Sequence, residues 1–327
     1  MSVNNVETQL LVIGFGSIGK RHYQNLLHFG HKVCVYDPNF DHSEDNVEVV
    51  PSIDVGLNDP TVSSVLICSP SEFHDIHLIN ALRHGKHCFV EKPVVTNFST
   101  IQTVKELAMK NNVSVFPGFH LRYNPALIWF QKHRKKLDLG KLLWFRAICS
   151  SWLPGWRDTP FLSGYAANPT SGGVIFDLSH EFDLVRQLFG SFDIGASMAQ
   201  SDFHINLPAD EMATILVSLN CGALGHMHLD YVSRKNRREI EIAFSNGFVK
   251  IDLLERTACI SPFGENDVNF VAEDALDSDY QKEIEHFIQT RKYGFDQKKF
   301  NELAETCLAI EIARKKAGLP VKETSGI

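Results

Sequence analysis

The stretch that most constrains this chain is "LLVIGFGSIGKRHYQNLL", residues 10–27, in which four apolar residues run into three glycines and a helical pattern follows. In a strand–turn–helix of this kind, the first glycine permits a tight turn and the second lets the backbone approach a pyrophosphate. The third lets the helix and strand pack closely. The N–H groups at the start of the helix are suited to bind phosphate oxygens. The pattern predicts a dinucleotide site formed by Gly14, Phe15, Gly16, Ser17, Ile18 and Gly19.

An acidic residue follows at a matching distance. Asp37 ends the next apolar run, "KVCVYD", 18 residues after Gly19. A carboxylate there can accept a hydrogen bond from the 2′-hydroxyl of an adenosine ribose and repels a 2′-phosphate, so it favours NAD over NADP. The alternatives are a bare glycine turn and an ordinary aspartate at a strand end. We favour the dinucleotide site because the strand, the helix and the acid occur together in the expected order.

The first ~120 residues alternate apolar runs with helical segments, which predicts a doubly wound parallel sheet covered by helices. Expected strands lie at 9–14, 32–37, 63–69, 87–92 and 113–118, and expected helices at 17–29, 73–84 and 99–110. After about Pro125 the pattern changes to a run of strands with hairpin turns at "NCG" and "SNG", preceded by helices over 125–136 and from about 174. A last helix is expected at about 301–317. We therefore predict a Rossmann domain over residues 1–124 and an α+β domain over residues 125–327.

Composition narrows the range of partners. The net charge is −7 with no dominant basic stripe, which is unfavourable for nucleic-acid binding. No apolar stretch approaches the ~18 residues of a membrane-spanning helix, and the first residues do not resemble a signal peptide. The seven cysteines are odd in number, scattered and without a C-x-x-C pair. This pattern is typical of a reduced, cytoplasmic protein.

Two further strand ends carry polar or turn-forming residues. Ser69 and Pro70 follow the third expected strand, and Glu91, Lys92 and Pro93 follow the fourth. Ligands of doubly wound sheets bind outside the carboxyl ends of the strands. Lys92 is therefore expected at the sheet edge where a nicotinamide would lie, although its position alone fits a solvated lysine equally well.

Several motifs together resemble the glucose–fructose oxidoreductase/inositol dehydrogenase (Gfo/Idh/MocA) family. They are "GFGSIGKRH", "CSPSEFHDIHLINALRHGKHCFVEKP", "GFHLRYNP" and "GGVIFDLSHEFDLVRQLFG". The resemblance implies a second domain with a large open, mainly antiparallel sheet, through which members form dimers or tetramers. It also implies NAD(P)-dependent oxidation of sugars or polyols, and a Lys-Pro bond that is often cis. Matched to the family, Lys92 is the active-site lysine. The residues matched to the cofactor site are Ser69, Pro70, His74, Glu91, Arg122 and Asn124.

The family's second motif is slightly altered here. Many members have Asp and His four residues apart, whereas Asp177 and His180 are three apart. That spacing still places both on one side of a continuous helix. The resemblance favours His180 as general base, Lys92 as the group that stabilises the developing alkoxide, and Asp177 as their orienting partner. The alternatives are a helix-dipole role for Asp177 and a half-buried structural histidine at 180.

Substrate contacts are expected from a Trp-rich loop, where Trp156, Arg157 and Tyr165 suit a sugar with an anionic group. The basic run 234–238 is either a solvated turn or a clamp on the diphosphate of a nucleotide sugar. No metal is required, and His226 and His228 are expected as polar residues on the cleft face of a sheet. The predicted function is NAD-dependent oxidation of a sugar, amino-sugar or nucleotide-sugar hydroxyl. The alternatives are an NAD-dependent glycosidase and a non-catalytic NAD-binding regulator.

Overall fold

The computed structural model describes residues 8–40, 46–156, 160–274 and 277–322, and it divides into two compact units. The first unit comprises residues 1–118 and Tyr280–Ala304, and the second comprises Phe119–Asp279 and 305–327. The boundary between the two units therefore lies six residues before the predicted boundary at 124/125. Residues 280–304, which the prediction assigned to the second domain, belong to the first unit. The physical reason is that Ile284 and Phe287 are fully buried in the core of the first unit, beside Leu10 and Leu26.

The first unit contains a six-stranded, all-parallel sheet in the order β3-β2-β1-β4-β5-β6. Its central strand β1 (Gln9–Ile13) is buried at every position, as expected for a strand covered on both faces. The other strands are β2 (Lys32–Tyr36), β3 (Glu48–Val49), β4 (Val62–Ile67), β5 (His87–Glu91) and β6 (Val115–Gly118). The doubly wound fold predicted from the alternating pattern is confirmed.

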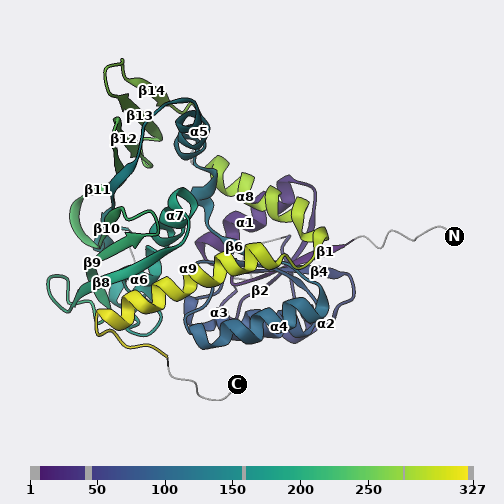
Figure 1. The fold of residues 1–327 in the computed structure, drawn as a ribbon. Helices are drawn as coiled ribbons and strands as arrows, with labels where there is room; N and C mark the ends of the chain where they lie inside the picture. Colours follow the sequence, from purple (N-terminus) through teal and green to yellow (C-terminus); the bar gives the residue numbers. More distant parts are fainter. Residues whose placement is uncertain (1–7, 41–45, 157–159, 275–276, 323–327) are drawn as a thin grey trace. The chain divides into compact units, whose positions relative to one another are not determined.

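Helices cover both faces of this sheet. Figure 1 shows α1 (Ser17–His28) and α8 (Asp277–Thr290) on one face, and α2 (Ile53–Asn58), α3 (His74–Arg83) and α4 (Ile101–Asn111) on the other. The sequence analysis placed α1, α3 and α4 to within two residues but missed α8. Because α8 follows a long run of strands belonging to the second unit, nothing local in the sequence assigns it to the first.

The second unit contains an eight-stranded sheet in the order β14-β13-β12-β11-β7-β10-β9-β8. All neighbouring pairs are antiparallel except β7 and β10. The strands are β7 (Leu142–Trp152), β8 (Phe192–Ser201), β9 (Asp210–Leu219), β10 (Leu224–Asp230), β11 (Val232–Phe244), β12 (Gly247–Asp252), β13 (Thr257–Pro262) and β14 (Val268–Val271). The large, mainly antiparallel sheet implied by the family resemblance is confirmed, and both predicted hairpins are present.

One face of this sheet carries the core of the second unit. The helices α6 (Val174–Asp177), α7 (His180–Phe189) and the last part of α9 (Gln297–Lys316) contribute to a single apolar cluster with the strands. Helix α5 (Pro125–His133) packs on β12, β13 and β14 (Figure 1). Its Trp129 stacks on Phe270. Side chains of the opposite face, such as Leu216 and Leu224, are exposed. Among the described helices, none is long and apolar enough to cross a membrane.

Candidate active site

The glycine turn between β1 and α1 has the shape that a pyrophosphate requires. Gly14 has a φ of +93°, and a Cβ there would lie 2.6 Å from the backbone nitrogen of Ser69. A Cβ on Gly19 would lie 2.0 Å from the carbonyl oxygen of Gly14, whereas a Cβ on Gly16 would meet no atom within 4 Å. Gly14 and Gly19 are therefore required by packing, and Gly16 faces open space. No side chain caps the start of α1 at Ser17, and its first turn has no acidic residue, so its N–H groups are suited to an anion.

Asp37 lies against this turn. Its Oδ2 accepts the N–H of Phe15 at 2.6 Å, and its Oδ1 accepts the N–H of Asn39 at 2.8 Å. Each carboxylate oxygen retains a second lone pair, which suits the hydroxyls of an adenosine ribose. The open space at Gly16 and the fixed carboxylate of Asp37 together fit a dinucleotide such as NAD.

His74 supports two loops at the same sheet edge. Its Nδ1 lies 2.7 Å from the carbonyl oxygen of Pro93, its Nε2 lies 2.8 Å from that of Ser69, and the side chain is buried. Burial lowers the pKa of His74, while the two carbonyls act in the opposite direction. Because both ring nitrogens contact backbone oxygens, His74 holds the Ser69 and Lys92 loops together and offers no nitrogen to a ligand. Its predicted contact with the cofactor stays a prediction.

Lys92 directly follows β5, and its bond to Pro93 is cis, as the family resemblance implied. The backbone N–H of Lys92 donates to Oε2 of Glu91 at 3.2 Å. Oε1 of Glu91 lies 2.8 Å from Nε2 of His22, a contact that the sequence analysis did not anticipate. Glu91 is thus engaged on both oxygens. Its side chain fixes the turn that carries Lys92.

Asp177 and His180 do not share a continuous helix, contrary to the prediction. α6 ends at Asp177 and α7 begins at His180, with Leu178 and Ser179 forming the break. Both side chains are buried, at 5% and 4% exposure. The His180 ring packs against that of His120, with centroids 4.4 Å apart.

Two tyrosines converge on Asp177. The hydroxyl of Tyr231 donates to Oδ2 at 2.7 Å, and the hydroxyl of Tyr165 lies 3.1 Å from the same oxygen. Burial raises the pKa of Tyr231 well above its usual value, and the charge of Asp177 adds to this effect. Tyr231 therefore stays protonated and acts as a donor. The sequence analysis missed Tyr231, which contacts a residue 54 positions away.

The start of α7 is held by two bidentate ion pairs. Arg122 donates to Asp183 at 2.8 and 2.6 Å, and Arg238 donates to Glu181 at 2.7 and 3.1 Å. Paired N–H groups facing paired carboxylate oxygens fix orientation as well as distance. These pairs determine where the first turn of α7, and hence His180, is placed. The predicted cofactor contact of Arg122 stays a prediction.

Asn124 has a structural role that the motif did not reveal. It is fully buried, its side-chain oxygen caps α5 through the N–H of Ala126, and its amide donates to the carbonyl oxygen of Leu253 at 3.2 Å. Both ends of the side chain are therefore used within the second unit. The predicted contact of Asn124 with the cofactor is not supported by this arrangement.

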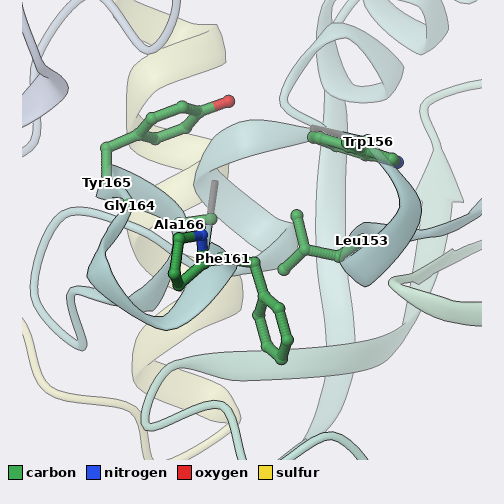
Figure 2. Close-up of a pocket in the computed structure, with 7 residues that line it drawn as sticks. Leu153, Trp156, Phe161, Gly164, Tyr165 and Ala166 are labelled. Atoms are coloured by element: carbon green, nitrogen blue, oxygen red, sulfur yellow. The ribbon is translucent and has the colours of Figure 1, made fainter. Parts of the chain in front are cut away.

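The predicted substrate residues Trp156 and Tyr165 line one mainly apolar pocket with Leu153, Pro160, Phe161, Gly164 and Ala166. Figure 2 shows Trp156 and Tyr165 on opposite sides of this pocket, with Leu153 and Phe161 between them. The Trp156 ring also packs edge-on against Tyr231, with centroids 5.3 Å apart. The pocket is thus connected through Tyr165 and Tyr231 to Asp177. Arg157 lies outside the described residues.

The basic run of β11 divides into separate roles. Arg238 pairs with Glu181, and Arg237 pairs with Glu239. Arg234 is exposed and lies over the Trp152 ring at 3.4 Å. Arg237 and Arg238 therefore stabilise the fold through ion pairs. Neither of the two predicted roles, a solvated turn or a diphosphate clamp, describes the whole run.

His226 and His228 lie on the face of the sheet opposite the apolar core. Their neighbours Met227 and Leu229 point into the core, so the two histidines share the opposite face with Leu224. His228 contacts Asp230 at 3.2 Å and Thr214 at 3.1 Å.

The fold and the glycine turn together are those of a nucleotide-binding oxidoreductase with a second, separate domain. Residues 8–119 match the oxidoreductase family with an NAD-binding Rossmann fold, and residues 130–250 match the GFO/IDH/MocA C-terminal domain. The chain therefore belongs to the Gfo/Idh/MocA oxidoreductase family, and NAD is the cofactor of that fold.

Characterised relatives act on polyols and sugars. The chain is 25% identical to myo-inositol 2-dehydrogenase of Thermotoga maritima, over 94% of this chain and 95% of that protein. It is 24% identical to UDP-N-acetylglucosamine 3-dehydrogenase of Acidithiobacillus ferrooxidans, over 75% of this chain and 74% of that protein. The solved complex of levoglucosan dehydrogenase with NADH and levoglucosan superposes with a TM-score of 0.81 at 17% identity, covering 95% of this chain and 97% of that one.

Proposed function

We propose that this protein is an NAD-dependent dehydrogenase that oxidises a ring hydroxyl of a sugar, amino sugar or nucleotide sugar. The observation that carries the proposal is the arrangement of one sheet edge in the first unit. There the open space at Gly16, the carboxylate of Asp37 and the turn bearing Lys92 follow strands β1, β2 and β5 of the same parallel sheet. This edge is where doubly wound folds bind their ligands.

The chemistry assigns one task to each side chain. A bound nicotinamide supplies the acceptor for the hydride that leaves the carbinol carbon. Lys92 donates a hydrogen bond to the reacting oxygen and stabilises negative charge developing there. His180 accepts the hydroxyl proton, since a neutral imidazole is a base suited to neutral pH. Asp177, held by two tyrosine hydroxyls, orients the groups around it.

The substrate class rests on the pocket of the second unit. Trp156 and Tyr165 offer aromatic faces to the apolar side of a sugar ring, and the Tyr165 hydroxyl gives that pocket a polar group. The similarity to dehydrogenases of inositol and of UDP-N-acetylglucosamine supports this class.

We further propose that the chain assembles as a homodimer or homotetramer through the open face of its large sheet. Trp144 and Leu224 are cross-strand neighbours on this face, with 41% and 64% exposure, and Leu216 lies on the adjacent strand. A row of exposed apolar side chains on a flat sheet is suited to a second copy of the same surface. The described cysteines are all free thiols, which supports a reducing, cytoplasmic setting.

Lys92→Ala tests the catalytic proposal. With a panel of polyols, amino sugars and nucleotide sugars, the intact protein is expected to form reduced cofactor in proportion to ketone product. Lys92→Ala is expected to lower kcat by roughly 100-fold or more, because one donor to the developing oxyanion is removed. Its dissociation constant for NAD, measured by fluorescence, should change less than about threefold. Lys110→Ala, an exposed lysine of α4, is the matched control.

Three outcomes would contradict the proposal. Full activity of Lys92→Ala would remove the lysine from catalysis. Net hydrolysis of a glycoside without net NADH would indicate a glycosidase that oxidises its substrate only transiently. NAD binding without turnover on any substrate of the panel would favour a regulator.

A further inference from the structure

A buried cluster of titratable side chains lies in the first unit, beneath the turn that carries Lys92. It comprises His22 of α1, Glu91 at the end of β5 and Glu283 of α8. His22 and Glu283 are fully buried and Glu91 is 8% exposed. One nitrogen or oxygen atom from each side chain lies within 4.8 Å of the other two. Three segments far apart in the sequence thus bring an imidazole and two carboxyls into the interior.

The cluster contacts the Lys92 turn directly. Nε2 of His22 lies 2.8 Å from Oε1 of Glu91, and Oε2 of Glu91 accepts the backbone N–H of Lys92 at 3.2 Å. Since a carboxylate only accepts, the imidazole donates from Nε2 in this contact. An unbroken path of hydrogen bonds therefore runs from α1 through Glu91 to the backbone of Lys92.

The imidazole of His22 is locked in place by its surroundings. Its ring packs edge-on against Phe89 of β5 and against Tyr280 of α8, with centroids 5.0 and 6.1 Å away. Its Nδ1 is buried and has no hydrogen-bond partner among the described residues. A buried polar atom without a hydrogen-bond partner destabilises the folded protein, and an apolar side chain at this position would avoid that cost. The presence of a histidine here therefore indicates a further role.

We propose that His22 and Glu283 are positioning residues for Lys92, acting through Glu91. The inference rests on the proposed role of Lys92. His22 holds the Glu91 carboxylate in the orientation that accepts the Lys92 N–H, and this fixes the backbone from which the lysine side chain extends. Glu283 places a carboxyl group within 4.8 Å of the other two side chains, and this contact restricts the position of the ring and of Glu91. Because α1 also carries the glycine turn, the same contact joins the phosphate site to the Lys92 turn.

A direct hydrogen bond explains the geometry better than a metal ion does. The separation of 2.8 Å is that of an ordinary hydrogen bond, and two of the three side chains have no exposure through which a hydrated ion would enter. The metal alternative makes a separate prediction, namely a stoichiometric ion in the purified protein that is lost when His22 is replaced.

The test compares His22→Leu, His22→Gln and Glu283→Gln in the full chain. His22→Leu removes the donor and keeps an apolar volume, and it is expected to lower kcat roughly tenfold or more, since small misplacements of a catalytic group are costly. The dissociation constant for NAD should stay within about threefold. His22→Gln restores an N–H donor and is expected to recover kcat to within about threefold of the parent. Glu283→Gln should lower kcat by about threefold or more with the same unchanged NAD affinity.

Gln9→Leu is the matched control. Gln9 is also buried in the parallel sheet, and its amide donates to a carboxylate, that of Glu48, at 2.8 Å. This contact lies between β1 and β3, away from Lys92, so Gln9→Leu is expected to leave kcat unchanged even if it lowers the melting temperature. A loss of kcat in Gln9→Leu equal to that in His22→Leu would show a general effect of stability and overturn the proposal.

The remaining outcomes separate this proposal from the proposed function. If Lys92→Ala is inactive while His22→Leu and Glu283→Gln keep full kcat, the positioning role is wrong and the proposed function stands. If Lys92→Ala keeps full activity, the proposed function fails first. If His22→Leu does not fold, Glu283→Gln decides. A metal ion at one per chain, found by elemental analysis and absent from His22→Gln, would overturn the hydrogen-bond account.

Discussion

Asp37 illustrates how one residue can serve the fold and the cofactor together. Its carboxylate accepts the N–H groups of Phe15 and Asn39, which fixes the glycine turn against the end of β2. In the proposed cofactor site, the same fixed charge accepts a hydrogen bond from a ribose hydroxyl and repels a 2′-phosphate. Exchange for an amide keeps the size of the side chain and removes the charge, so it separates these two effects.

Asp37→Asn is expected to narrow the preference for NAD over NADP by about tenfold, which corresponds to about 1.4 kcal/mol. The cause is the loss of repulsion between the carboxylate and the 2′-phosphate. The ratio of kcat/KM for the two cofactors measures it, with Asp193→Asn, an exposed residue of β8, as control. An unchanged ratio would exclude Asp37 from the ribose site.

The sequence could predict those candidate site residues whose roles follow from their spacing within a short segment of the chain. Gly14, Gly16 and Asp37 belong to one strand–turn–helix–strand unit, so their separation along the chain fixes their separation in space. Tyr231 with Asp177, and Arg238 with Glu181, are pairs 54 and 57 residues apart. Hydrophobic periodicity and motif spacing do not predict such contacts, because each contact depends on the register of a sheet and on the packing of helices against it.

Among the elements, α1 was predictable in full, whereas α8 and β8 were not. α1 follows a glycine turn and shows a clear apolar face, with Tyr23 and Leu26 in the core. β8 is an edge strand of mostly exposed small and polar residues, in which Ile194 is among the few buried side chains, so its sequence lacks a strong alternation. The break between α6 and α7 was hidden by a helical pattern that continues across it.

The junction of β1 and α1 yields a prediction at the scale of the element. Gly19→Ala places a Cβ 2.0 Å from the carbonyl oxygen of Gly14, so helix and turn must separate, and the free energy of unfolding should fall by about 1–3 kcal/mol. Gly16→Ala meets no protein atom and has an ordinary φ of −70°, so its stability should change by less than about 1 kcal/mol. Its methyl group enters the space proposed for the pyrophosphate and should weaken NAD binding by about tenfold or more.

Denaturant unfolding and NAD titration of both variants provide the measurement, and each variant serves as the control for the other. A stable Gly16→Ala protein that binds NAD as tightly as the parent would place the pyrophosphate elsewhere. Unchanged stability of Gly19→Ala would mean that the turn can relax without loss.

For the whole molecule, half-buried histidines link stability to pH. Burial lowers the pKa of His77 to about 4, with a smaller contribution from His74. Burial is also the first cause of the lowered pKa values of His31 and His87 in the same unit. Each pKa in the folded state lies below that of the unfolded chain, near 6.5. The unfolded chain therefore binds more protons in this range, and the free energy of unfolding should fall as the pH falls from about 6.5 toward about 4.

His77→Asn isolates one of these groups. It removes a titrating ring whose Nδ1 lies 2.9 Å from the Ser69 hydroxyl. Between about pH 6 and 5, the dependence of the free energy of unfolding on pH should become shallower by up to about 1.4 kcal/mol per pH unit, the value for one proton. Ser69→Ala breaks the same contact and keeps the ring, so its slope should match that of the parent, whatever its absolute stability. Equal slopes for His77→Asn and the parent in urea titrations at both pH values would show that His77 takes up its proton equally in the folded and unfolded chain, which would contradict its burial beneath the Ser69 loop.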